Sequence, residues 1–215
     1  MLTIYSVPTS LYCAKLRVLL RHKRLDWREL APPGGYGSDA YKQFVPSGNL
    51  PALVYDDLLL TDSEAIAEYL NEKHPEPPML PGPISERARI RERSRFHDTR
   101  LEPAVRRLFS YLDGKLHPPE TFSALADDIS TRLTQLAQLL KLSPPSNVLT
   151  LGDCGYPITF AWIEALIPIL ELEISWPPSV SQWSVSLREH PAVAEELVSY
   201  RPTVTDWLNN SGACA

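Results

Sequence analysis

The chain has 215 residues and a formal net charge of -5 at pH 7, with 44% hydrophobic and 22% charged residues, as expected for a soluble globular protein of one large or two small domains. The negative charge and the absence of a Lys/Arg block argue against nucleic acid as the main partner. No apolar run approaches the roughly 20 residues that span a bilayer, and the first residues lack a signal-peptide pattern, so we expect a cytoplasmic protein without a membrane partner.

The N-terminal part of the chain predicts a small α/β domain. Residues 2–5 alternate and are rich in strand formers, and a helix follows from Leu11 to between His22 and Arg24, with Ser10 at its start. Residues 25–30 read as a second strand, so the opening is β-α-β with a right-handed crossover. A short helical turn is expected at 39–44.

The next stretch predicts a hairpin that leads into a helix. Leu50-Pro51 opens an apolar run, and a second apolar run follows Asp56-Asp57. Asp62 and Ser63 then precede apolar residues at helical spacing, so they stand at a helix N-terminus, where backbone N–H groups and a positive dipole end gather. A ligand carboxylate would be satisfied there, and Asp62 could accept a ligand ammonium group; the alternative is that either residue is only an N-cap.

Five prolines between Pro75 and Pro83 mark a domain boundary, because proline continues neither a helix nor a strand ladder. We therefore expect a domain at 1–76, a linker at 77–83 and a second domain at 84–215. The second domain shows helical patterns and no convincing strand. Its predicted helices cover 84–112 with a break at Pro103, 121–142, a buried central helix at 156–172, 180–189 and 192–200.

Cysteine usage predicts neither a disulfide framework nor a metal site. Cys13, Cys154 and Cys214 are far apart in the sequence. We expect reduced thiols, and Cys13 in particular as a small buried residue.

This layout resembles that of the soluble glutathione transferases, and four motifs carry the resemblance. Residues 9–17, TSLYCAKLR, look like the S/C-x-x-x-x-K/R-x-R opening of the serine and cysteine classes of bacterial type. Residues 50–53, LPAL, resemble V-P-x-L, and 61–70, TDSEAIAEYL, resemble E/D-S-x-A-I-x-x-Y-L. The ending around 183–193 is also similar. The resemblance implies a thioredoxin-like α/β N-terminal domain and an all-α C-terminal domain.

The resemblance also implies a glutathione site. Asp62 and Ser63 would hold the γ-glutamyl end, and the backbone of Leu50, before a cis Pro51, would pair with the cysteinyl part. Asn49 stands where some relatives place a glutamine that contacts the peptide. A homodimer is implied, together with a small hydrophobic electrophile bound by the helical domain.

Ser10 is the expected activator of the glutathione thiol. A thiol with a pKa of about 8.5 is mostly protonated at neutral pH, and a hydroxyl at a helix N-terminus stabilises its thiolate by about one to two pKa units. The alternatives are that Ser10 is an ordinary N-cap or that Ser6 contacts the sulfur. Tyr5 is expected in the strand core.

The acceptor pocket is less well defined by the sequence. His97, Arg100 and Arg107 are candidates to line it, on the inner side of the predicted 84–112 helix. Relatives read S/T-x-x-D at the start of the buried helix, whereas Thr159-Phe160-Ala161-Trp162 lacks the acid. We therefore expect an incomplete capping box there.

Three functions are compatible with these residues. The leading one is a glutathione transferase that conjugates or dehalogenates a small electrophile. The second is glutathione-dependent isomerisation of a maleyl compound, although Ser10-Leu11-Tyr12 departs from the S-S-C of that class. The third is a non-catalytic glutathione-binding dimeric scaffold.

Overall fold

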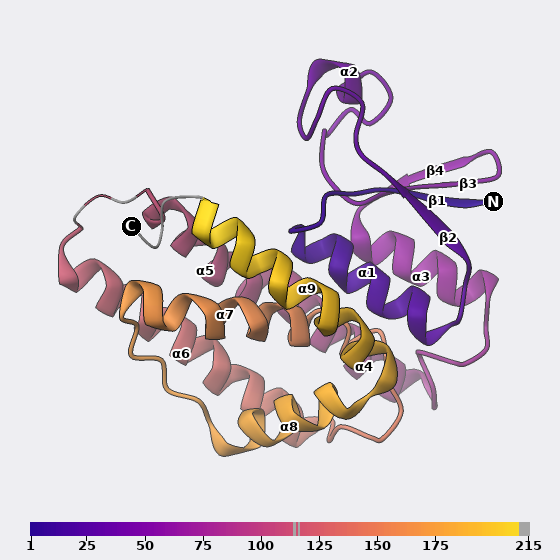
Figure 1. Cartoon of the computed structure of the whole chain (residues 1–215). Helices are drawn as coiled ribbons and strands as arrows, with labels where there is room; N and C mark the ends of the chain where they lie inside the picture. Colours follow the sequence, from indigo (N-terminus) through magenta and orange to yellow (C-terminus); the bar gives the residue numbers. More distant parts are fainter. Residues whose placement is uncertain (114, 116, 211–215) are drawn as a thin grey trace.

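The computed structural model describes residues 1–113, 115 and 117–210 and confirms the expected fold (Figure 1). A thioredoxin-like α/β domain precedes a domain made of helices. The elements of the first domain are β1 (Leu2–Tyr5), α1 (Leu11–His22), β2 (Trp27–Leu30), α2 (Asp39–Lys42), β3 (Ala52–Tyr55), β4 (Leu58–Thr61) and α3 (Ser63–Lys73).

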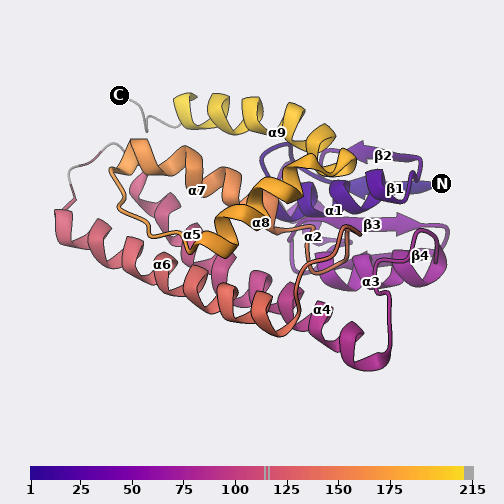
Figure 2. The ribbon, with the colours of Figure 1, turned by 90° about the horizontal axis from the view of Figure 1, so that it is seen from below.

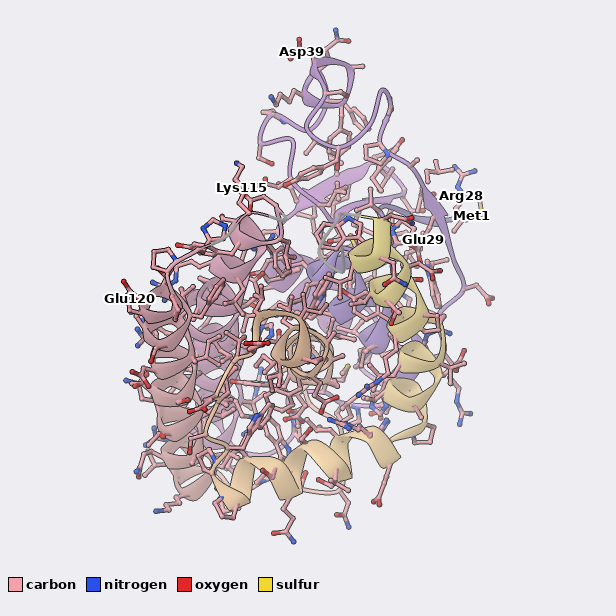
Figure 3. The ribbon with its side chains drawn as sticks, turned by 60° about the vertical axis from the view of Figure 1, so that its left-hand side comes forward. Met1, Arg28, Glu29, Asp39, Lys115 and Glu120 are labelled. Atoms are coloured by element: carbon pink, nitrogen blue, oxygen red, sulfur yellow. The ribbon has the colours of Figure 1, made fainter. Side chains whose placement is uncertain are left out.

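The sheet has the strand order β2-β1-β3-β4. β1 pairs with β2 in parallel and with β3 antiparallel, and β3 and β4 form the predicted hairpin. Helices α1 and α3 lie together on one face of this sheet, and α2 stands on a segment that projects from it (Figure 1). Asp39 lies at the outer end of that segment (Figure 3).

The second domain begins after a stretch, between α3 and α4, without a helix or strand in the structure. Its boundaries at 77–83 and 84–215 stay a prediction. Its elements are α4 (Ile84–Phe96), a π turn η1 (His97–Leu101), α5 (Glu102–Arg106), a 3-10 turn η2 (Arg107–Tyr111), α6 (Pro119–Leu142), α7 (Tyr156–Leu170), α8 (Pro178–Glu189) and α9 (Pro191–Asn210).

Helix α9 continues beyond the Tyr200 at which the sequence pattern places its end. Pro202 lies inside the helix and removes one backbone donor. Val204 and Leu208 are nevertheless buried in the core, so tertiary packing outweighs the local cost of the proline. As a result α9 lies along both α7 and α1 (Figure 2) and links the two domains.

An S/T-x-x-D pair does precede α7, so the expectation that its acid is missing was wrong, although the N-cap residue Gly155 itself has no side-chain capping bond. Asp153 Oδ2 accepts hydrogen bonds from Thr150 N at 2.8 Å and Thr150 Oγ1 at 2.6 Å. The S/T-x-x-D motif is therefore Thr150-Leu151-Gly152-Asp153, in the turn that precedes the helix. Thr159 lies inside α7 and bonds to His97 instead.

Two histidines meet where the end of α1 contacts the junction of α8 and α9. The rings of His22 and His190 lie 5.0 Å apart between centroids. His22 Nε2 and His190 Nδ1 are buried without a hydrogen-bond partner in the described part of the chain. Burial, then the neighbouring His190, Lys23 and Arg24, lowers the pKa of His22 to about 4. Burial also lowers the pKa of His190, against the opposing charge of Asp153.

This contact predicts a loss of stability in mild acid. The folded-state pKa of His22 is about 4 against an ordinary 6.5, so between these values the unfolded chain binds more protons and the free energy of unfolding falls as the pH falls. His22→Gln removes one of these protonations and should flatten the slope of urea-unfolding free energy against pH in this window. Equal slopes in the variant and the parent chain would contradict the assignment.

Candidate functional site

A cavity of about 790 Å³ lies between the two domains, and both contribute to its wall. The N-terminal domain provides Ser10, Tyr12, Asn49, Leu50, Asp62 and Ser63, among others. The structure thus brings together all the residues predicted for glutathione binding and thiol activation except Pro51, which is buried and does not line the cavity.

Ser10 is the N-cap of α1 and also faces the cavity. Its Oγ accepts a hydrogen bond from Cys13 N at 3.3 Å. The capping alternative is therefore observed, but a hydroxyl that accepts one bond still carries a hydrogen to donate. Ser10 can thus serve the helix and an anion in the cavity together.

The neighbours of Ser10 are engaged elsewhere. The hydroxyl of Ser6 donates to Glu29, and Ser6 is not part of the cavity wall. Cys13 is buried, and this burial raises its pKa to about 11, so it is a protonated thiol at neutral pH. Tyr5, at the end of β1, packs against the rings of Tyr41 and Phe44.

Asp62 caps helix α3 at the opposite side of the cavity. Its Oδ1 accepts hydrogen bonds from Glu64 N at 2.9 Å and Ala65 N at 3.0 Å, and its φ of 89° lies in the left-handed region. Ser63 follows as the first residue of the helix and is buried at the cavity wall. A carboxylate placed here meets the positive end of a helix and a hydroxyl donor.

The segment before β3, which lies in the sequence between the N-termini of α1 and α3, also faces the cavity. The Leu50-Pro51 bond is cis, and Asn49 and Leu50 line the cavity. Tyr41 holds this segment from below, because its hydroxyl donates to Asn49 O at 3.0 Å. The arrangement places a backbone segment before a cis-proline at the cavity wall, where a peptide-like ligand could pair with it.

A buried ammonium group joins this wall to the helical domain. Lys15 Nζ donates to Glu64 Oε2 at 2.7 Å and to Asp98 Oδ2 at 2.8 Å, and its side chain is only 3% exposed. Burial alone would lower the pKa of Lys15, but the two carboxylates outweigh it and raise that pKa. His97 also contacts Asp98, at 2.7 Å from Nδ1 to Oδ1.

Asp98 is ionised at neutral pH although it is buried. Burial favours its neutral form, but the hydrogen bond from His97 and the charge of Lys15 lower its pKa to about 2. Asp98 reaches the cavity wall. A negative charge is therefore fixed where the two domains meet.

The helical domain lines the cavity with residues that sequence reasoning did not select. Arg95, Arg106, Phe109, Trp162 and Trp207 face it. The π turn adds a residue to the helix and rotates everything after it, so the side chains that share a face cannot be read from 3.6-residue spacing.

None of the three predicted acceptor-pocket candidates lines the cavity. His97 is buried between Asp98 and Thr159. Arg107 pairs with Asp128 on the outside, and the Arg100 side chain bonds to the backbone of Thr99. That expectation was wrong.

The residues that the structure describes offer neither a membrane-spanning helix nor a metal site. No helix among them combines the length and the apolar character needed to cross a bilayer. No three His, Cys, Asp or Glu side chains in the same part of the chain are grouped so as to hold a metal ion.

Comparisons with known proteins agree with this geometry. Residues 4–78 match the family model for the glutathione S-transferase N-terminal domain. The chain is 32% identical over 143 residues to glutathione S-transferase Z2 of Arabidopsis thaliana, covering 65% of this chain and 64% of that protein. It is 32% identical over 105 residues to maleylacetoacetate isomerase of Dictyostelium discoideum, covering 46% and 48%.

Solved structures extend the likeness to both domains. A glutathione S-transferase from Rhodospirillum rubrum F11 superposes with a TM-score of 0.72 at 26% identity, covering 92% of each chain. The chain spans about 64% of the length of the Arabidopsis relative. Together these findings show that the chain is similar to glutathione S-transferases in part of its sequence and over most of its fold, and they assign no subclass.

Removing the buried cation should destabilise the fold. In Lys15→Met, Glu64 and Asp98 are left as buried carboxylates without their counter-charge, which typically costs about 3 to 5 kcal/mol. Urea unfolding measures this loss. The control is Lys73→Met, because Lys73 pairs with Asp56 on the surface, where the effect should be small. A Lys15→Met variant as stable as the parent would refute the role of this network.

Proposed function

We propose that the protein is a glutathione transferase of serine type, in which Ser10 stabilises the glutathione thiolate for attack on a small hydrophobic electrophile. The observation that carries the proposal is one cavity with two helix N-termini and a cis-proline backbone edge on its wall. An anionic terminus, an extended peptide and a thiolate each need one of these features.

The glutathione tripeptide fits this wall in one direction. Its γ-glutamyl carboxylate lies at Ser63 and the start of α3, and its ammonium group lies near Asp62, with the charge of Asp98 on the same cavity. The cysteinyl backbone pairs with Leu50, and Asn49 contacts the peptide. This direction carries the sulfur toward Ser10.

The reaction follows from the thiolate. Ser10 donates a hydrogen bond to the sulfur, and the dipole of α1 favours its negative charge, so the thiol proton passes to solvent at neutral pH. The sulfur then forms a bond to the electrophilic carbon. In a displacement, the leaving group departs with the electron pair of its broken bond.

Isomerisation of a maleyl compound is the second candidate. Arg95 and Arg106 line the cavity and would attract an acidic substrate. The Dictyostelium relative is named for that activity. In this reaction the thiolate would add to the double bond, and the resulting single bond would rotate. The thiolate would then leave, so that the double bond forms again and glutathione is not consumed.

The assembly and location of the protein are part of the same proposal. We propose a cytoplasmic homodimer, supported by the transferase-like fold and by the resemblance. A dimer with glutathione bound but no turnover of any electrophile would instead favour the scaffold function.

Ser10→Ala tests the thiol activator. The variant should bind glutathione with an affinity close to that of the parent, while the pKa of the bound thiol rises by about one to two units and kcat/KM at neutral pH falls roughly 10- to 100-fold. The thiolate absorbance in the ultraviolet measures the pKa directly. Ser6→Ala is the matched control, and a loss there instead of at Ser10 would reverse the assignment.

Ser63→Ala tests the glutamyl end. Loss of a hydrogen bond to a carboxylate should raise the dissociation constant for glutathione by roughly 10-fold or more. Calorimetric titration of glutathione measures it. Ser38→Ala is the control, because Ser38 caps α2 and does not line the cavity. Unchanged affinity in Ser63→Ala would place the glutamyl end elsewhere.

A further inference from the structure

We infer that Tyr200 is a positioning residue for the proposed thiol activator. Its hydroxyl holds the peptide unit between Thr9 and Ser10 from the helical domain, and so directs the Ser10 side chain toward the glutathione sulfur. The inference rests on the proposed transferase function and adds a residue to the same site. Tyr200 lies on α9 and does not line the cavity, so it acts on the sulfur only through Ser10.

The segment that brings Ser10 to the cavity belongs to neither β1 nor α1. The strand ends at Tyr5 and the helix begins at Leu11, so no strand ladder and no complete helical turn fixes the backbone of residues 7–10. Thr9 and Ser10 nevertheless line the cavity. The orientation of the Ser10 side chain therefore depends on the individual hydrogen bonds that the peptide groups of this segment make.

The peptide unit between Thr9 and Ser10 is bonded on both of its sides. Ser10 N donates to Val7 O at 3.1 Å, and Thr9 O accepts from the Tyr200 hydroxyl at 2.9 Å. Because a peptide unit is planar, bonds to its N–H and its C=O together fix the rotation of the plane. Ala14 N donates to Ser10 O at 3.0 Å and fixes the next unit. The Ser10 side chain leaves the backbone between these two held units.

The direction of the bond from Tyr200 is set by its neighbours. Trp162 Nε1 donates to the Tyr200 hydroxyl at 2.8 Å. An indole N–H can only donate and a carbonyl oxygen can only accept, so the phenolic hydrogen points to Thr9 O. Burial raises the pKa of Tyr200, although the hydrogen bond from Trp162 opposes the shift. The phenol therefore keeps its proton at every pH near neutrality.

Tyr200 is itself anchored by a group of contacts between α9 and α1. Glu196, one turn earlier on α9, is fully buried and accepts from Arg17 Nε at 2.7 Å. The Arg17 guanidinium lies 6.0 Å from the centroid of the Tyr200 ring and also donates to Pro8 O at 3.3 Å. Two successive carbonyl groups, those of Pro8 and Thr9, are thus held by one group of side chains on these two helices.

Tyr200→Phe tests the inference, because it removes the hydroxyl and keeps the ring. We expect the pKa of the bound glutathione thiol to rise by about half a unit to one unit, since the Ser10 hydroxyl remains but is less well directed. kcat/KM should then fall about 3- to 10-fold at about pH 6 and approach the parent value at about pH 9, where the thiol is ionised in both proteins. The affinity for S-methylglutathione, which has no thiol to ionise, should be unchanged.

Tyr156→Phe is the matched control. Tyr156 is also buried, and its hydroxyl also donates to a backbone carbonyl, that of Arg93 at 2.8 Å. This bond reaches α4 instead of residues 7–10, and Tyr156 does not line the cavity. Both variants should unfold at a lower temperature than the parent chain, because each loses a buried hydrogen bond. Only Tyr200→Phe should change the thiol pKa, which the ultraviolet absorbance of the thiolate measures.

Amide hydrogen exchange adds a readout that needs neither glutathione nor turnover. The Ser10 amide should exchange faster in Tyr200→Phe than in the parent chain, because the peptide unit that contains it is then held on one side only. In Tyr156→Phe it should exchange at the parent rate. Parent-like exchange of the Ser10 amide in Tyr200→Phe would overturn the inference.

The outcomes distinguish this inference from the function on which it rests. If Ser10→Ala raises the thiol pKa and Tyr200→Phe does not, or if Tyr156→Phe raises it equally, the positioning role is overturned and the transferase function stands. A thiol pKa that Ser10→Ala leaves unchanged would overturn the proposed role of Ser10, and the positioning role of Tyr200 with it.

Discussion

The buried ammonium group of Lys15 is the interaction on which the geometry of the cavity depends. A charge that is removed from water must be compensated within the fold. Glu64 and Asp98 provide that compensation at 2.7 and 2.8 Å. Lys15 lies on α1, Glu64 on α3 and Asp98 on η1. Ser10 caps the first of these elements, Ser63 begins the second, and the third lies where the domains meet. The ion pairs of Lys15 therefore also set the relative position of the proposed binding groups.

A second group of contacts fixes the opposite side of α1. Arg17 Nε donates to the fully buried Glu196 of α9 at 2.7 Å, and Tyr200, one turn further on, reaches Thr9. Helix α9 also brings Trp207 to the cavity. The N-terminus of α1 is thus held between a polar network toward α3 and η1 and a network toward α9. The proposed thiolate site therefore lies at the end of a helix that is held from both sides.

The sequence predicts well where the residues proposed to bind glutathione lie, because that part of the wall is built from local motifs. Each motif can be recognised from a few neighbouring residues. Ser10 is a cap residue, Pro51 stands before a strand, and Asp62 begins an acid-hydroxyl pair before an apolar helix. The order of the domains, α/β first and helical second, is predicted from the change in the period of the hydrophobic residues and from the proline cluster.

The side of the cavity formed by the helical domain could not be predicted in the same way, because it is built from tertiary contacts. The π turn at 97–101 shifts the helix phase and turns Arg106 and Phe109, instead of Arg107, toward the cavity. Helix α9 passes through Pro202 because its far end is buried, which no local rule anticipates. The Thr150–Asp153 pair that precedes α7 lies in a turn whose backbone geometry the sequence pattern does not reveal.

A crystal structure with glutathione bound would test the central claim most directly. We expect the sulfur to lie within hydrogen-bonding distance of Ser10 Oγ and the γ-glutamyl carboxylate to meet Ser63. A sulfur that faces Ser6 or Tyr12, or a tripeptide bound outside the cavity between the two domains, would contradict it.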